Sequence, residues 1–449
     1  MLRVFVRRFA SDRRGSTALI FGLSLIPISF LTGMAIDFAS AAQKRTRLNA
    51  AADSAALAAV TPAMMMQSNS TAQTAATNMF NAMAANIGAA SVNPPTITIS
   101  DAGLVRTVTV SYTGTSTNTF PNVLALLTKT SQTTWPLAGT ATATSFSAPN
   151  INFYLLLDNS PSMDIAATTA GINTMVANTS AQGGCALACH ETNPTAADTA
   201  GNPTVNGKVE DNYALANSLG VVTRIELMAQ ATSALMTTAG DTEAANNATY
   251  QMAIYTFNYN GLSTVYAPNN APSSNLSAAS SAASSIDVLE VCSNNYITCS
   301  NENNDTDTNF ETAMTAINNL MPNPGTGSST STPQEVLFIV SDGVDDEVNS
   351  SSCSEPLDGT RCQQPFNTSM CTTIKNRGIM IAVLYTEYLP LTTNGWYNEW
   401  IAPFQSTIGS NIESCASPGL YFEITTDGDV TAAMQNLFQL AIATARLSK

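Results

Sequence analysis

The sequence has little charge and almost no histidine. Asp, Glu, Lys and Arg together make up 11% of its 449 residues, and His190 is its single histidine. So low a charge content is more typical of an extracytoplasmic protein than of a cytosolic enzyme. A Ser-His-Asp hydrolase would have to use His190, and the chain contains no Gly-x-Ser-x-Gly nucleophile elbow. We therefore expect a protein that binds a partner and is not an enzyme, with a serine hydrolase as the weaker alternative.

Basic residues are scarce after residue 47. The first 47 residues hold eight of the 17 Lys and Arg but only two of the 32 acids, which leaves nine bases against 30 acids, a net charge of about −21, in the remainder. Such an acidic body repels a phosphate backbone. We therefore expect no nucleic-acid partner.

Cysteine is absent from the first 184 residues, and the eight cysteines lie at Cys185, Cys189, Cys292, Cys299, Cys353, Cys362, Cys371 and Cys415. An even number in one region is typical of disulfides formed in an oxidising compartment. Spacing leaves the pairing open, with Cys185–Cys189 and Cys292–Cys299 as first expectations. The string "CALACH" has one residue too many between its cysteines for a haem attachment sequence, and a single histidine argues against a zinc site.

One uncharged run of 21 residues, "STALIFGLSLIPISFLTGMAI", covers residues 16–36. A helix of that length reaches about 30 Å, the hydrocarbon thickness of a bilayer, and Pro27 is tolerated in a membrane helix. Five arginines precede the run, whereas the next basic residue is Lys44, so the positive-inside bias predicts residues 1–15 in the cytoplasm and the rest outside. The alternative is a cleaved signal peptide, because small residues surround Ser40.

The segment after this run has the pattern of a helix followed by strands. Leu48, Ala52, Ala55 and Ala59 form a narrow apolar stripe, which suits either packing within one domain or a seam between subunits. Polar and apolar residues then alternate in "VRTVTVSY" from Val105, and "TITIS" and "TATATSF" have the same character. We expect a small α+β stem over residues 37–148.

The strings "RRGSTALIFGLSLIPISFLTGMAIDF" and "RTRLNAAADSAALAAV" resemble the TadE/TadG-like amino-terminal region of Tad (Flp) pilus-assembly proteins. The resemblance covers roughly the first 60 residues. It implies a pilin-like stem in a bacterial cell membrane, with the Tad secretion and pilus machinery as partner. Pilin-like relatives that are processed by a prepilin peptidase usually carry Glu five residues after the cleavage-site glycine. Here Ile20 stands at that distance from Gly15, which argues against processing.

The pattern changes at Ile151. The strings "INFYLLL" from Ile151, "EVLFIV" from Glu335 and "GIMIAVLY" from Gly378 are almost continuously apolar, as in parallel strands covered on both faces. Helical patterns intervene in "TRIELMAQATSALMTTA" and "NFETAMTAINNLM" and follow in "VTAAMQNLFQLAIATARL". Strands that alternate with helices predict a doubly wound, Rossmann-like α/β domain with a mostly parallel sheet over residues 149–449.

Oxygen-bearing side chains follow these predicted strands, where ligands of such domains lie. "DNSPSM" offers Asp158, Ser160 and Ser162 after the first strand, and "FIVSDG" places Asp342 after another. "NDTDTNFETAM" adds Thr306 between them. Carboxylates and hydroxyls suit a small hard dication, although turn formation and helix capping would also explain such residues.

These residues resemble the metal-ion-dependent adhesion site of the von Willebrand factor A (vWA) family, whose Asp-x-Ser-x-Ser, Thr and second Asp fall on Asp158, Ser160, Ser162, Thr306 and Asp342. The resemblance implies Mg²⁺, or another dication such as Mn²⁺ or Ca²⁺, with an open position for a carboxylate of a protein partner. Cysteine-containing insertions at about 164–222 and 343–373 depart from the family pattern.

Two neighbouring acidic strings have simpler interpretations. "DTDTNFE" lacks the glycine and terminal glutamate of an EF-hand, and we expect Thr308 in it to cap a helix. "SDGVDDE" supplies Asp345 and Asp346, which we expect in a solvated turn. The sequence thus predicts a single-pass membrane protein, with its bulk periplasmic or extracellular, that binds a partner through a metal ion in Tad pilus assembly or surface adhesion. The alternative is a vWA adhesin or regulatory module unrelated to pili.

Overall fold

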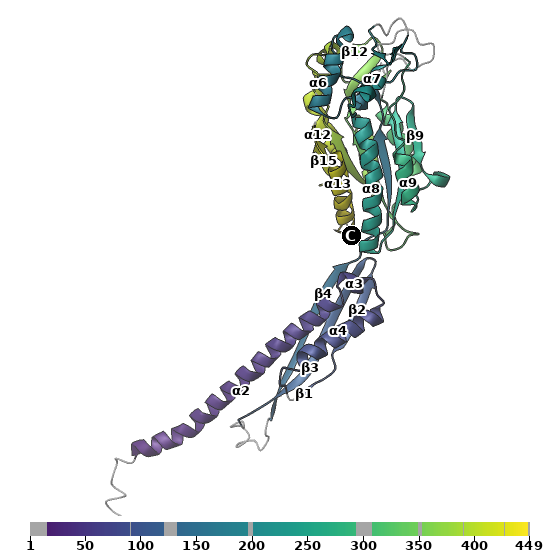
Figure 1. The fold of residues 1–449 in the computed structure, drawn as a ribbon. Helices are drawn as coiled ribbons and strands as arrows, with labels where there is room; N and C mark the ends of the chain where they lie inside the picture. The colour runs from purple at the N-terminus through teal and green to yellow at the C-terminus, as the bar shows by residue number, and fades with distance from the viewer. Residues whose placement is uncertain are drawn as a thin grey trace, which may run out of the picture. The chain divides into compact units, whose positions relative to one another are not determined.

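The computed structural model describes residues 16–89, 91–120, 133–195, 201–292, 308–348, 353–388, 390–425 and 427–447. The chain forms two compact units, Met1–Ser147 and Ala148–Lys449, and each combines helices with a β-sheet (Figure 1). The predicted mixed α/β class is confirmed. The expected division between residues 148 and 149 lies one residue from the division between the two units.

In the first unit, helices pack on one face of an antiparallel sheet. The helices are α2 (Ser16–Ala58), α3 (Pro62–Met65) and α4 (Asn69–Ala84), and the strands are β1 (Ser91–Val92), β2 (Thr96–Ala102), β3 (Val105–Thr117) and β4 (Thr134–Phe146). The long strand β3 pairs with all three others. Its alternate residues Val108, Val110 and Tyr112 are buried in the core of this unit, as the alternation predicts.

Helix α2 has two parts with different surroundings. Near its N-terminus large apolar side chains are exposed, including Leu19 at 64% and Phe21 at 66%. By length and composition, the helix over Thr17–Ala58 can cross a membrane. Further along, the stripe that begins at Leu48 is fully buried against α4 and the sheet. Of the two alternatives for this stripe, packing within its own unit is the one observed.

Asp37 ties α2 to the end of β3. The residue is 4% exposed, and its carboxylate accepts hydrogen bonds from the backbone N–H groups of Thr119 at 2.8 Å and Phe120 at 2.9 Å. One turn earlier, a Cβ atom at Gly33 would lie 2.6 Å from the Phe120 ring. The glycine therefore permits the close approach of the Phe120 ring to the helix.

The second unit contains a six-stranded sheet in the order β15-β14-β10-β5-β8-β9. Its strands are β5 (Ile151–Asp158), β8 (Tyr250–Asn258), β9 (Gly261–Tyr266), β10 (Gln334–Ser341), β14 (Met380–Thr386) and β15 (Tyr421–Ile424). Neighbouring strands are parallel except for β9, which is antiparallel to β8. Strand β5 therefore lies in the middle of the sheet, between β10 and β8.

Both faces of this sheet are covered. In β5, Phe153 and Leu155 belong to one hydrophobic core, whereas Tyr154 and Leu156 belong to the other. Helices on the first face are α8 (Arg224–Asn246), α9 (Leu276–Ala283) and α13 (Val430–Leu447), and those on the second are α10 (Phe310–Leu320), α11 (Ser369–Asn376) and α12 (Gln405–Cys415). Burial on two faces explains why the strand sequences are continuously apolar.

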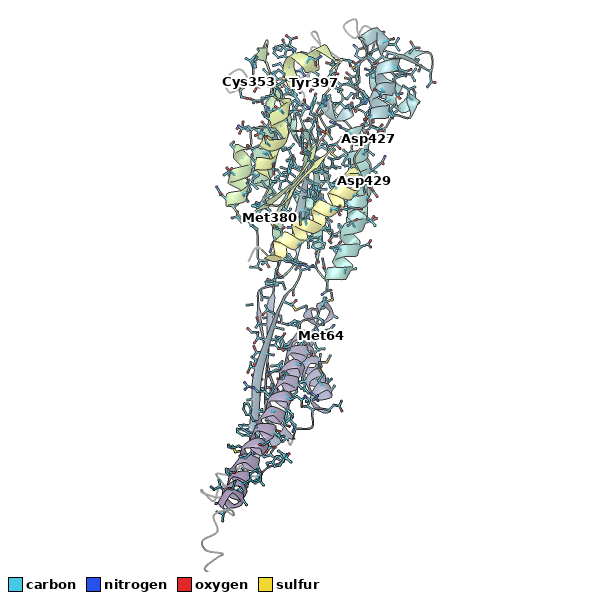
Figure 2. All side chains as sticks on the ribbon, turned by 90° about the vertical axis from the view of Figure 1, so that its left-hand side faces the viewer. Met64, Cys353, Met380, Tyr397, Asp427 and Asp429 are labelled. Atoms are coloured by element: carbon cyan, nitrogen blue, oxygen red, sulfur yellow. A yellow bond between two sulfur atoms is a disulfide. The ribbon has the colours of Figure 1, made fainter. Side chains whose placement is uncertain are left out.

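Short elements gather at the carboxyl ends of the parallel strands. Cys353 and Tyr397 lie at this end of the unit, whereas Met380, the first residue of β14, lies toward the other (Figure 2). The helical elements here are Pro161–Asp164 (η2), Thr169–Asn178 (α6), Ser180–Gln182 (η3), Asn212–Leu219 (α7) and Tyr397–Ile401 (η5), and the strands are Thr204–Val205 (β6), Lys208–Val209 (β7), Val344–Val348 (β11), Leu357–Asp358 (β12) and Arg361–Pro365 (β13). The first predicted insertion has a small core of its own around Met175 and Leu215.

The disulfides differ from the expectation based on spacing. Cys353 pairs with Cys362, and Cys371 pairs with Cys415. Cys185 and Cys189 are both buried and are not bonded to each other, so that predicted bridge is wrong. The Cys185 thiol instead donates to the carbonyl oxygen of Leu187. Cys292 is disulfide-bonded, and its predicted partner Cys299 lies outside the described residues.

Candidate functional site

Asp158, the last residue of β5, is the centre of a hydrogen-bond network. Its Oδ1 accepts from the backbone N–H of Ser160 at 3.0 Å and from the Ser160 hydroxyl at 2.7 Å. Its Oδ2 accepts from the hydroxyl of Ser341 at 2.6 Å. Because Ser341 ends the neighbouring parallel strand β10, the two strand ends are linked through one carboxylate.

Ser162 and Asp342 join the same network. The Ser160 and Ser162 hydroxyls lie 3.0 Å apart, and the Ser162 side chain is near enough to Asp342 to lower the pKa of its carboxyl group. The turn that carries Asp342 requires the following glycine, because Gly343 has a φ of +80° and a Cβ atom there would lie 2.6 Å from Cγ2 of Ile408. The structure therefore brings four of the five sequence-predicted site residues together at one edge of the sheet.

The fifth residue, Thr306, lies outside the described residues. Its neighbour Thr308 is 2% exposed and exchanges backbone hydrogen bonds with Asp346 of β11. The prediction that Thr308 caps the helix α10 is wrong. The cap is Asn309, whose side-chain oxygen accepts from the backbone N–H of Thr312 at 3.0 Å.

The two carboxyl groups of the site are fully buried, with 0% exposure for both Asp158 and Asp342. Burial, and secondly the charge of Asp342, raise the pKa of Asp158 to about 7. Burial also raises the pKa of Asp342, against the opposing effects of the Ser162 side chain and the charge of Arg224. Two adjacent buried carboxylates are costly without a compensating cation, because each loses its hydration and repels the other.

Arg224 supplies part of that compensation. It begins helix α8, is 8% exposed, and donates a hydrogen bond from Nη2 to the carbonyl oxygen of Glu387. Its Nη1 has no hydrogen-bond partner among the described residues. The guanidinium therefore places one positive charge near the two carboxyl groups of Asp158 and Asp342.

Sequence reasoning missed three residues of this region: Ser341, Arg224 and Asp345. Asp345 was expected in a solvated turn, but it is 2% exposed, and its Oδ1 accepts from the backbone N–H of Phe310 at 2.9 Å. Burial raises its pKa to about 8. Its neighbour Asp346 is also buried and pairs with Arg361. For Ser341 the sequence offers one signal, its position directly before Asp342 in the string "FIVSDG".

The donor set of the site fits a small hard dication in part. Hydroxyls of Ser160 and Ser162 stand beside the carboxylates of Asp158 and Asp342, and such oxygens are preferred by Mg²⁺. Oδ2 of Asp342 is buried and has no hydrogen-bond partner among the described residues. In that same part of the chain, no group of three or more His, Cys, Asp and Glu residues is arranged to hold a metal. An ion at this site would therefore depend on the serine hydroxyls as ligands.

His190 has contacts of a different kind. Its Nδ1 lies 2.9 Å from Oδ2 of Asp211, and its ring lies 4.7 Å from that of Tyr213. Hydrogen bonding to Asp211 raises the pKa of His190. The hydrogen bonds of the Ser160 hydroxyl are to Asp158 and Ser162.

Comparison with known proteins identifies the N-terminal region. Residues 15–76 match the Tad family model of Flp pilus-assembly TadE/G-like proteins. This confirms the resemblance drawn from the first residues, for that region of the chain. No curated protein matches the sequence significantly.

Similar solved structures are distant. One is the pilus adhesin SpaC of Lactobacillus rhamnosus GG, with 11% identity and a TM-score of 0.33 over 79% of this chain and 35% of that one. The minor pilin PilB of Streptococcus sanguinis has 10% identity and a TM-score of 0.34 over 79% of this chain and 78% of that one. The SpRpn10 VWA domain has 8% identity and a TM-score of 0.31 over 65% of this chain and 95% of that one. Likenesses this weak assign neither fold family nor function.

Proposed function

We propose that the protein is a membrane-anchored component of Tad pilus assembly or surface attachment whose second unit is a vWA domain that binds a protein partner through a divalent cation. The single observation that carries the proposal is the network that joins Ser160, Asp158 and Ser341 across the ends of two parallel strands, with Ser162 and Asp342 beside it.

The sheet supports the vWA assignment. In the sheet, the strand that comes first in the sequence, β5, lies between β10 and β8, so the strand order reverses between β5 and β10. Ligands of open α/β sheets bind at such a point, where the connections leave in opposite directions. Asp158 is the last residue of β5, and Asp342 directly follows β10.

The side chains have distinct tasks in this mechanism. Ser160 and Ser162 would offer neutral oxygens to the ion, while Asp158 and Asp342 would supply negative charge directly or through water. Mg²⁺ demands nearly octahedral coordination and keeps several waters, so a site with few charged ligands leaves a position for an external group. A carboxylate of the partner is the chemical complement of such a position.

Anchoring to a membrane is supported by the first unit. Helix α2 presents exposed apolar residues such as Leu19 and Phe21, and residues 15–76 match the Tad family model. With residues 1–15 in the cytoplasm, the second unit would stand on the outer side of a bacterial cell membrane, where an oxidising compartment permits the Cys371–Cys415 disulfide.

Titration of the full chain in detergent with Mg²⁺ by calorimetry tests the ion. We expect saturable binding by the parent, and loss of at least about tenfold in affinity in Asp342→Ala, because a buried ligand oxygen is removed. The matched control is Asp358→Ala, which removes an exposed carboxylate that is not one of the predicted ligands. Equal affinities in Asp342→Ala and the parent would refute the metal site.

Deletion of the gene tests the biological role. Loss of pilus assembly, restored by the parent but not by Asp342→Ala, is expected. Normal pili together with reduced attachment to a surface would favour the alternative, a vWA adhesin with no part in pilus assembly.

A further inference from the structure

A polar pocket of about 660 Å³ lies beside the turn that carries Asp342. Its wall is connected to that turn through the backbone, because the N–H of Phe366 donates to the carbonyl oxygen of Gly343 at 3.2 Å. The side-chain amide of Asn411 in turn donates to the carbonyl oxygen of Phe366 at 2.7 Å. A partner seated at Asp342 would therefore reach the pocket with neighbouring residues.

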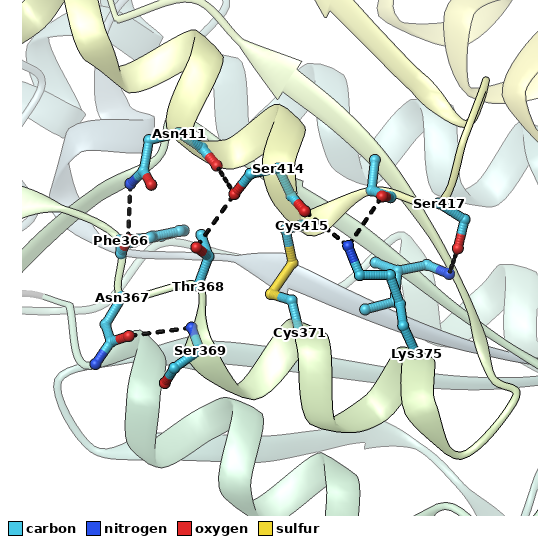
Figure 3. The surroundings of a disulfide bond; sticks show 12 residues. Phe366, Asn367, Thr368, Ser369, Cys371, Lys375, Asn411, Ser414, Cys415 and Ser417 are labelled. Atoms are coloured by element: carbon cyan, nitrogen blue, oxygen red, sulfur yellow. Dashed lines mark hydrogen bonds between the residues drawn. A yellow bond between two sulfur atoms is a disulfide. The ribbon is translucent and has the colours of Figure 1, made fainter.

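Two disulfides brace the pocket. Cys371–Cys415 joins α11 to α12, and on one side of it the Ser414 hydroxyl donates to Thr368 (Figure 3). Cys353–Cys362 holds the opposite wall, where the backbone N–H and the hydroxyl of Ser354 both donate to Oε1 of Gln364. Walls fixed in this way lose little conformational freedom when a ligand binds.

The charge of the pocket is negative. Glu311 and Glu355 line it, together with hydroxyl and amide side chains, and no lysine or arginine lines it among the described residues. One oxygen of Glu311 accepts a hydrogen bond from Asn367 at 3.2 Å, so this carboxylate is held but not neutralised.

Basic side chains of the neighbouring elements are engaged elsewhere. Lys375 donates to the carbonyl oxygens of Ser414 and Ala416, on the other side of the disulfide from Thr368 (Figure 3). Arg361 forms an ion pair with Asp346. The two glutamates of the pocket therefore lack a cationic partner from these side chains.

We propose that this pocket binds a lysine or arginine side chain of the protein partner. The inference rests on the proposed function, which brings the partner to Asp342. A partner segment with a carboxylate at the ion and a basic residue nearby would fill both the ion site and the pocket. A neutral sugar is less suited to the pocket. Its one aromatic lining residue, Phe366, is 2% exposed and is stacked on Phe310 with 3.9 Å between ring centroids, so it offers no face for sugar stacking.

The test uses the full chain in detergent at low ionic strength, with EDTA present, and the peptide acetyl-Gly-Lys-Gly-Lys-Gly-amide as probe. We expect millimolar binding by calorimetry that weakens about tenfold in the double variant Glu311→Gln/Glu355→Gln, as two exposed charge pairs are lost. The control Glu399→Gln/Glu423→Gln makes the same change in net charge at exposed residues outside the pocket and should bind as the parent does. Thermal melting verifies that each variant is folded.

Four results would overturn the inference. They are absence of peptide binding by the parent, equal binding by both double variants, equal binding of the lysine-acetylated peptide, and tighter binding of a neutral oligosaccharide. EDTA separates this test from that of the ion site. If Mg²⁺ fails to bind while the peptide result holds, the proposed metal site fails alone; if the peptide result fails while Mg²⁺ binds, the pocket inference fails alone.

Discussion

Mg²⁺ should stabilise the folded protein, and Asp158→Asn should remove that effect. The folded site gathers two buried carboxylates, whereas the unfolded chain does not, so the ion binds chiefly to the folded state. At a concentration 100 times the dissociation constant, such an ion adds about 2.7 kcal/mol to the free energy of unfolding. For a unit of this size, that corresponds to a rise of about 5 °C in the melting temperature.

The asparagine variant isolates charge from shape. Asn keeps the size of the side chain and an oxygen that can accept from Ser160, but it removes one of the two buried charges. Without Mg²⁺ at pH 8 we therefore expect Asp158→Asn to melt at the parent's temperature or above it, since its repulsion with Asp342 is gone. With Mg²⁺ we expect almost no further rise.

Differential scanning calorimetry of the full chain in detergent, with EDTA or with Mg²⁺, measures both quantities. Asp358→Asn, at an exposed residue, is the matched control and should respond to Mg²⁺ as the parent does. A rise with Mg²⁺ of the same size in Asp158→Asn and the parent would refute the assignment of Asp158. A variant that melts well below the parent in EDTA would refute the repulsion between the two carboxylates.

Three further predictions concern other parts of the chain. Burial raises the pKa of Glu335 to about 8, so its contribution to stability is present below its ordinary pKa of 4.5 and is lost as the pH rises through about 8. Glu335→Gln should therefore flatten the dependence of the unfolding free energy on pH by at most about 1.4 kcal/mol per pH unit, measured by urea denaturation. Replacing Cys371 and Cys415 by Ala should lower the unfolding free energy by about 4 kcal/mol, and replacing Cys353 and Cys362 by about 2.5 kcal/mol, because the closed loops span 44 and 9 residues. Equal losses in the same assay would contradict the loop-length argument. Asp37→Ala should remove the acceptor of the Thr119 and Phe120 backbone N–H groups, seen as faster hydrogen exchange at residues 119 and 120, and unchanged exchange there would contradict it.

The parts of the fold that were predicted have local signals. Strand β5 is apolar at successive positions because Leu155 and Leu156 face different cores, and β3 alternates because only one of its faces is fully buried. Helix α8 begins after Thr223, whose backbone N–H donates to Oε2 of Glu226 at 2.8 Å.

The parts that were missed depend on residues far apart in the sequence. Asp346 was expected to be solvated because nothing near it in sequence suggests burial, but Arg361 pairs with it from the neighbouring strand β13. Cys371 and Cys415 meet because α11 and α12 pack on the same face of the sheet, which spacing does not reveal.

The candidate site combines residues that are close in the sequence with residues that are far apart in it. Asp158, Ser160 and Ser162 lie within five residues, so their hydroxyls and carboxylate meet through local turn geometry. Ser341 reaches Asp158 only because β10 is the parallel neighbour of β5, and Arg224 reaches the region from the start of α8. Parallel strand order is set by the whole sheet, and the sequence string alone does not specify it.

Crystallography of the protein grown with Mn²⁺ tests the central claim most directly, because anomalous scattering locates this ion without ambiguity. We predict a single strong peak at the carboxyl ends of β5 and β10, within ligand distance of the Ser160 and Ser162 hydroxyls and with Asp158 and Asp342 bound directly or through water. Absence of a peak there at saturating Mn²⁺, with the same four side chains hydrogen-bonded only to one another, would contradict the account.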